Sequence, residues 1–87
     1  MELNNTVKLM NSTDYKDRFK AEYYQTRIRY DKLNTFIAKI EVSEEYPKKV
    51  DRPQFDCPLT LLKEQRALMY QYLQLLIERA LIEKIDL

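Results

Sequence analysis

Glycine and histidine are absent from this chain of 87 residues, and cysteine occurs once. Tight β-hairpin turns need residues with positive φ, which glycine supplies most easily, so the lack of glycine disfavours a fold rich in β-sheet. The lack of histidine removes the commonest metal ligand and the commonest general acid or base at neutral pH. Because Cys57 has no second cysteine to pair with, the chain forms no internal disulfide, and we expect a reducing compartment.

An excess of charge of one sign and long apolar runs are also missing. The 15 basic and 14 acidic residues nearly cancel to a net charge of +1, whereas domains that coat nucleic acids are usually strongly basic. No run approaches the roughly 18 apolar residues that cross a bilayer, and the chain does not open on a signal-peptide pattern. We therefore expect a cytoplasmic protein with no membrane partner, and the charge disfavours a nucleic-acid partner.

Helical periodicity dominates the first half of the chain. Residues 1–11 show weak periodicity and are interpreted as an N-terminal arm, and good N-cap residues follow at positions 12–14. We predict one helix over residues 14–41, about 42 Å long at about 1.5 Å per residue. Apolar and aromatic side chains recur there in steps of three and four, at Tyr15, Phe19, Tyr23, Thr26, Tyr30, Leu33, Ile37 and Ile40.

Prolines mark the connection and the start of a second helix. Pro47 and Pro53 interrupt the helical pattern and predict an irregular connector over residues 42–57. Pro58 suits the first position of a helix, which we predict over residues 58–84. One stripe of this helix holds Leu61, Gln65, Leu68, Tyr72, Leu75, Arg79 and Ile82, and it is widened by Leu62, Met69, Leu73, Leu76, Ile77 and Ala80.

These elements predict an all-α fold: a single domain over residues 12–87, built as a long antiparallel helical hairpin with an irregular, proline-containing connector. The apolar stripe of the second helix is broader than one partner helix can cover. We therefore expect copies of the hairpin to assemble into a homo-oligomeric bundle.

Tyrosines and basic residues carry most of the chemistry of this sequence. A tyrosine ring can stack on any nucleobase, although tyrosines on a helical stripe also serve as core or interface residues. Arginine can hold a phosphate through two hydrogen bonds, although Arg27 and Asp31, four residues apart, also suit a local helix pair. Tyr24 lies off the main stripe and is the better candidate for an exposed stacking or interface role. The candidate ligand-binding residues are Tyr15, Arg18, Lys20, Tyr24, Arg27, Lys32, Tyr72 and Arg79.

Arg79 falls on the leucine-rich stripe of the second helix, where an unpaired guanidinium would be costly to bury. Glu78 is adjacent in sequence and points elsewhere on a helix, so we expect a partner from another helix or a ligand phosphate.

Signals for catalysis, metals and cofactors are missing. The carboxylates show no metal-ligand spacing, and without glycine no phosphate-cradling loop can form. Cys57 has no histidine to activate it. We predict no catalytic residue, no metal site and no cofactor, and therefore a protein that is not an enzyme.

Two segments resemble the phage anti-CBASS/anti-Thoeris helical-hairpin sponge family, which comprises small proteins related to crAss-like phage products. The segments are DRFKAEYYQTRIRYDKLNTFI at residues 17–37 and EQRALMYQYLQLLIERA at residues 64–80. The resemblance implies an oligomer of helical hairpins, acting in the cytoplasm of an infected bacterial cell, that binds cyclic nucleotide immune signals without cleaving them. The positions implied for ligand or interface roles are Arg18, Lys32, Tyr72 and Arg79. The adjacent tyrosines at 23 and 24, the long connector and the arm depart from the family pattern.

The leading hypothesis is a phage-encoded, non-enzymatic protein that sequesters cyclic oligonucleotides or cyclic ADP-ribose isomers and so inhibits anti-phage defence. The alternative is a phage protein that inhibits a host protein through its helical face, without a small-molecule ligand. A structural helical oligomer or a weak nucleic-acid binder is a third interpretation.

Overall fold

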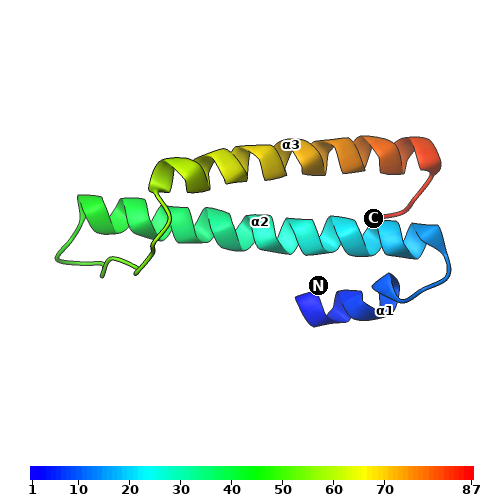
Figure 1. Cartoon of the computed structure of the whole chain (residues 1–87), viewed down its shortest axis with the longest axis horizontal. Coiled ribbons are helices and arrows are strands. Elements are labelled where there is room, and N and C mark those ends of the chain that lie inside the picture. The colour runs from blue at the N-terminus through cyan, green and yellow to red at the C-terminus, as the bar shows by residue number, and fades with distance from the viewer.

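The computed structural model describes all 87 residues, and its regular elements are all helices (Figure 1). A short 3₁₀ helix η1 (Leu3–Thr6) runs into the four-residue helix α1 (Val7–Met10), and two long helices, α2 (Tyr15–Glu45) and α3 (Leu59–Glu83), follow. α2 and α3 lie side by side and run antiparallel, and α1 lies against another side of α2. The predicted all-α helical hairpin is confirmed.

α2 begins one residue later than predicted and ends four residues later. Asp14 is its N-cap, with a carboxylate that accepts a hydrogen bond from the backbone N–H of Lys16. Near the other end, the hydroxyl of buried Ser43 donates to the carbonyl of Ile40 at 2.7 Å, so this polar side chain fits inside the helix. The helix stops at Tyr46, since a residue that precedes proline is disfavoured in the α-helical conformation.

α3 occupies nearly the predicted range, with one residue fewer at each end. Pro58 is the N-cap, with an extended ψ of 140°, and so stands just outside the helix rather than at its first position. At the other end, Lys84 adopts a left-handed conformation with φ of 56°, and the backbone N–H of Ile85 reaches the carbonyl of Ala80. The chain then turns back toward the start of α2 (Figure 1).

The N-terminal arm is ordered against α2 by a small polar contact. Thr6 is fully buried; its hydroxyl donates to the carbonyl of Leu3 and accepts a hydrogen bond from the Gln25 amide at 2.9 Å. Ala21, one turn before Gln25, is also buried. The arm therefore packs on the hairpin of its own chain.

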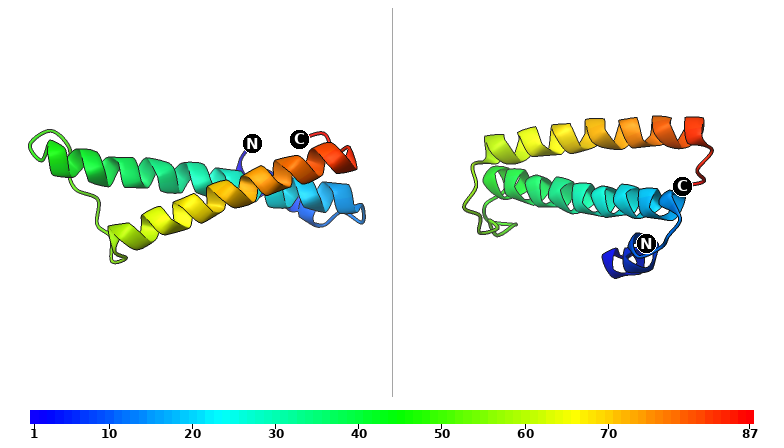
Figure 2. Two further views of the ribbon diagram at one scale, coloured as in Figure 1. Left: turned by 90° about the horizontal axis from the view of Figure 1, so that it is seen from above. Right: turned by 45° about the vertical axis from the view of Figure 1, so that its right-hand side comes forward.

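The main core lies where α3 crosses α2, which the view from above shows (Figure 2, left). There Phe19 and Tyr23 pack with the residues that α3 and the C-terminal tail contribute: Leu73, Leu76, Ala80 and Ile85. Farther along α2, Ile37 and Ile40 are fully buried.

The face of α3 that packs on α2 is not the main apolar stripe predicted from the sequence. That stripe is exposed at every apolar position: Leu61, Leu68, Leu75 and Ile82 are 52%, 58%, 57% and 80% exposed. The residues expected only to widen the stripe supply the core instead. Helical spacing identifies apolar rows on a helix but does not say which row its neighbour covers.

The molecule is an elongated rod of 50 × 24 × 20 Å. Its radius of gyration of 16.1 Å exceeds the roughly 12 Å expected for a compact domain of this length. Only 11 of the 87 residues are buried, so a large part of the apolar surface faces outward. None of the helices is both long and apolar enough to cross a membrane.

Candidate functional site

The eight residues proposed from the sequence as ligand contacts do not converge on one cavity of the protomer. Lys32 lines a hollow on α2, and Tyr72 lines a separate groove on α3. The other six line neither of these cavities, nor a third one beside the C-terminal tail. At the N-terminal end of α2, Tyr15 is exposed and Arg18 donates to the backbone carbonyl of Ser12 at 2.8 Å.

Tyr72 and Arg79 lie in a cluster where α3 meets the start of α2. The Tyr72 hydroxyl donates to the Glu22 carboxylate, and this bond is the main cause that raises the pKa of Tyr72. Arg79 Nε lies 2.9 Å from Glu83 Oε2, and its guanidinium carbon stands 4.8 Å from the centre of the Phe19 ring. The hydrogen bond to Glu83 is the largest cause that raises the pKa of Arg79.

The partner of Arg79 differs from the prediction, because its carboxylate comes from the same helix. Glu83 follows four residues later, one turn along the same face, and the direct contact from the neighbouring α2 is the Phe19 ring. With Glu22 also nearby, two carboxylates surround one guanidinium. This cluster therefore has no surplus positive charge to attract a phosphate.

Tyr24 and Arg27 are engaged with Tyr23 on α2. Tyr23 is buried, and its ring meets that of Tyr24 edge to face at 5.2 Å between centroids. Arg27 Nη1 donates to the Tyr23 hydroxyl at 3.2 Å, and this bond, followed by the charge of Asp31, raises the pKa of Arg27. Tyr24 packs against the core cluster and is half-buried. The exposed stacking surface expected of Tyr24 is not what the structure shows.

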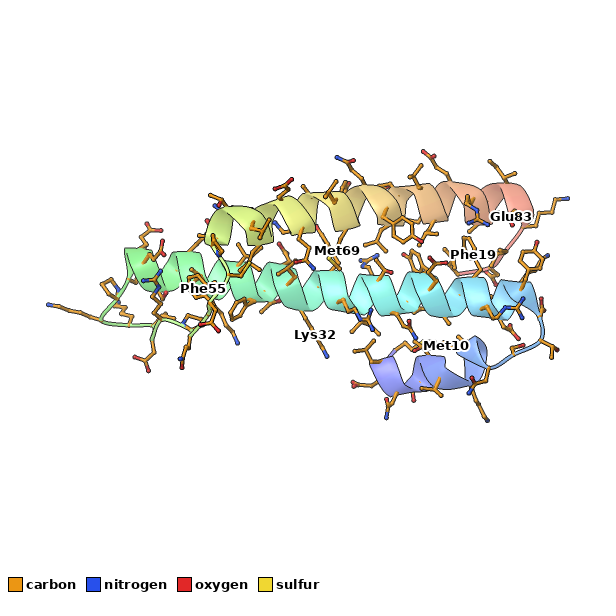
Figure 3. The ribbon with its side chains drawn as sticks, in the orientation of Figure 1. Met10, Phe19, Lys32, Phe55, Met69 and Glu83 are labelled. Atoms are coloured by element: carbon orange, nitrogen blue, oxygen red, sulfur yellow. The ribbon has the colours of Figure 1, made fainter.

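A hollow of about 370 Å³ lies on the side of α2 that faces away from α3, and Lys32 points toward that side in Figure 3. We call it the lysine hollow; it is lined by Asp31, Lys32, Thr35, Phe36 and Lys39. Lys32 and Lys39 are seven residues apart, so they stand about 10 Å apart along one helix face.

The charge balance of the lysine hollow is positive. Lys32 and Lys39 form none of the four ion pairs of the chain. Asp31, the acidic residue of the lining, is paired with Arg27 at 3.6 Å. Arg27 therefore offsets the charge that would repel an anion, and two lysine charges remain without a carboxylate partner.

The connector places aromatic rings beside the lysine hollow. The Phe36 ring meets Phe55 of the connector edge to face at 6.2 Å between centroids. Phe55 is covered in turn by Arg52, whose guanidinium carbon lies 5.1 Å from the ring centre and which bonds Glu44 at 3.2 Å. These contacts hold an apolar ring next to the two lysines.

Sequence reasoning identified Lys32 but missed Thr35, Phe36 and Lys39. The cluster of tyrosines and basic residues ends at Lys32, and beyond it the pattern indicates only the apolar stripe of Leu33, Ile37 and Ile40. The spacing of seven between Lys32 and Lys39 was the available signal, since it places both on one face of a helix.

A second cavity is an open groove of about 530 Å³ along α3, and its character is different. It is lined by Leu61, Glu64, Gln65, Leu68, Met69 and Tyr72. Its one charged residue is acidic, so the groove suits an apolar surface better than an anion. No group of three or more histidine, cysteine, aspartate or glutamate side chains lies close enough to hold a metal ion.

Comparison with known proteins identifies a family for most of the chain. A family model described as Sequestin matches residues 13–82, which include nearly all of both long helices and the whole connector. The searches of curated proteins and of solved structures gave no match. The chain belongs to the Sequestin family.

Proposed function

We propose that this protein binds a cyclic nucleotide immune signal, a cyclic oligonucleotide or a cyclic ADP-ribose isomer, and holds it without cleaving it. Acting as a phage protein in the cytoplasm of an infected bacterium, it would inhibit anti-phage defence by keeping the signal from its receptor. One observation carries the proposal: Lys32 and Lys39 stand on one face of α2, without carboxylate partners, beside the Phe36 ring.

The chemistry of the lysine hollow fits such a ligand. Cyclic oligonucleotides and cyclic ADP-ribose isomers carry at least two phosphate charges within one compact ring, and two flexible lysine side chains based about 10 Å apart can each meet one of them. The Phe36 ring supplies an apolar face for a base, because stacking on an aromatic side chain tolerates any base. The Thr35 hydroxyl, between the lysines, can donate to a phosphate or ribose oxygen.

Sequestration without catalysis is supported by two further observations. The Sequestin name is compatible with a protein that retains a ligand. The residues around the hollow are lysines, a threonine, a phenylalanine and an already paired aspartate. That set can bind phosphate and stack on a base, but it lacks the activated nucleophile that bond cleavage commonly uses.

Isothermal calorimetry with a panel of cyclic di- and trinucleotides and cyclic ADP-ribose isomers tests the binding. We expect one ligand class to bind at micromolar concentrations or below. Lys32→Ala and Lys39→Ala should each weaken that binding about tenfold, which corresponds to about 1.4 kcal/mol. Lys63→Ala is the matched control, because Lys63 is a half-exposed lysine on α3 whose surface pair with Glu41 contributes little.

The same measurements distinguish binding at the lysine hollow from binding at other residues that the sequence predicted as ligand contacts. Loss of binding in Tyr24→Ala or Arg79→Ala, with Lys39→Ala unaffected, would place the ligand on those residues instead. Denaturing the complex and analysing the released ligand by chromatography should return it intact. A cleaved ligand, or no binding by any member of the panel, would reject the proposed function.

A further inference from the structure

α3 carries an exposed row of four large apolar side chains spaced by seven residues. The row, which we call the α3 seam, consists of Leu61, Leu68, Leu75 and Ile82, each more than half exposed. Exposed apolar patches rimmed by polar residues mark interaction sites on soluble proteins. The rod buries only 11 residues of its own, so covering the seam would add greatly to its apolar core.

The spacing of the seam indicates what kind of surface covers it. A straight α-helix drifts by about 20° for every seven residues, so a strict repeat of seven stays in contact only with a second helix that winds around it. Packing in the hairpin does not use this row, because α2 covers Leu73, Leu76 and Ala80 instead. The occupant should therefore be a helix with the same repeat along a similar length, which a second copy of α3 supplies.

We propose that two copies of this chain associate through the α3 seam, with their α3 helices running in the same direction. Each seam residue then packs against its own counterpart, as equivalent positions of a seven-residue repeat do in a parallel coiled coil. The α3 groove, lined in part by Leu61 and Leu68, lies along the same face and would be covered by the second copy.

The residues flanking the seam determine the direction. One flank consists of Glu64, Gln71 and Glu78, and the other of Gln65, Tyr72 and Arg79. In a parallel pair, a two-fold axis along the helices brings the glutamate flank of one copy against the arginine flank of the other. Glu78 then meets Arg79 of the partner subunit, whose terminal guanidinium nitrogens can still donate because Glu83 takes only Nε. In an antiparallel pair, like flanks meet, and Glu64 would face Glu78 of the partner subunit, which is repulsive.

Sedimentation analysis of the whole chain at micromolar concentrations tests the association. We expect a species of twice the chain mass of 10.6 kDa. Leu68→Glu should weaken the association at least tenfold, with helical circular dichroism unchanged, because Leu68 is 58% exposed in the protomer. Leu81→Glu is the matched control, since Leu81 is 76% exposed and lies off the seam, and it should associate as the parent chain does.

Crosslinking tests the direction of the helices. With Cys57→Ser as background, Ile82→Cys should form a disulfide-linked dimer under mild oxidation, because position 82 faces itself in the parallel pair. In the antiparallel pair it would face position 61, so a crosslink only on mixing Leu61→Cys with Ile82→Cys would overturn the proposed direction. A monomer at all concentrations would overturn the proposed association, and the seam would then be a binding surface for a different protein. None of these results depends on what the lysine hollow binds.

Discussion

At the scale of single residues, the hydrogen bond from Tyr72 to Glu22 predicts a measurable pH effect. The bond raises the folded-state pKa of Tyr72 above the ordinary value of about 10. Its stabilisation is therefore complete below about pH 10 and is lost as the pH rises through the folded pKa. The contribution to the free energy of unfolding is small, because Tyr72 is 40% exposed and solvent screens the interaction.

Alkaline titration followed by tyrosinate absorbance measures this effect. The chain has seven tyrosines, and Tyr72→Phe should remove intensity from the highest-pH part of the curve. Tyr15→Phe is the control, because Tyr15 is 49% exposed and its hydroxyl has no carboxylate partner. Equal losses at the same pH in both variants would mean that the bond to Glu22 does not form in solution.

Leu76 provides the corresponding test of the core. It is 1% exposed and belongs to the cluster between α2 and α3. Leu76→Ala should lower the free energy of unfolding by about 2–5 kcal/mol, because it removes buried methyl groups and leaves a cavity. Leu81→Ala, at an exposed position on the same helix, should change it by about 0.5 kcal/mol or less. Similar values from denaturant titrations of the two variants would contradict the observed face of α3.

At the scale of elements, the sequence predicted most of the fold because helix formation depends on local patterns. The predicted stripe of α2 includes Phe19, Tyr23, Ile37 and Ile40, and all four are buried. On α3 the prediction failed, because two adjoining apolar rows satisfied the same spacing and only the crossing with α2 selects between them. The lysine hollow was only partly predictable: its lining residues all lie on α2, but no local pattern specifies the path of the connector, which brings Phe55 against Phe36.

The left-handed end of α3 predicts that glycine would stabilise a chain that contains none. Lys84 has φ of 56°, a conformation that costs about 1 kcal/mol for a residue with a Cβ atom and nothing for glycine. Lys84→Gly should therefore raise the midpoint of thermal unfolding. Glu78→Gly, inside the same helix, should lower the midpoint, because glycine in a helix interior lowers the free energy of unfolding by about 1 kcal/mol. A lower midpoint for Lys84→Gly would show that the side chain of Lys84 stabilises the fold by more than its left-handed backbone destabilises it.

The N-terminal arm should open independently of the hairpin. The hydrogen bond from Gln25 to buried Thr6 joins it to α2, and the helix within it is only four residues long. Gln25→Ala should therefore speed amide exchange in residues 3–10 and leave the core of α3 unchanged, because such a bond contributes about 1 kcal/mol. Exchange that accelerates equally in all helices would mean that the arm and the hairpin unfold as one unit.

At the scale of the whole molecule, the two proposed surfaces lie apart on a long rod. The lysine hollow is on the side of α2 away from α3, whereas the seam runs along α3 (Figure 3). Groups that share no partner and lie far apart contribute almost additively to free energies. Binding of the ligand and association of the copies should therefore be separable.

Two variants measured in both assays test that separation. Leu68→Glu should leave the affinity for the bound cyclic nucleotide unchanged while it weakens association. The double variant Lys32→Ala/Lys39→Ala should associate normally while it loses the ligand. If Leu68→Glu abolished both, the ligand would have to lie between copies. Tyr72 and Arg79, which flank the seam, would then be its most plausible contacts, because they are the candidate residues that a second copy would enclose.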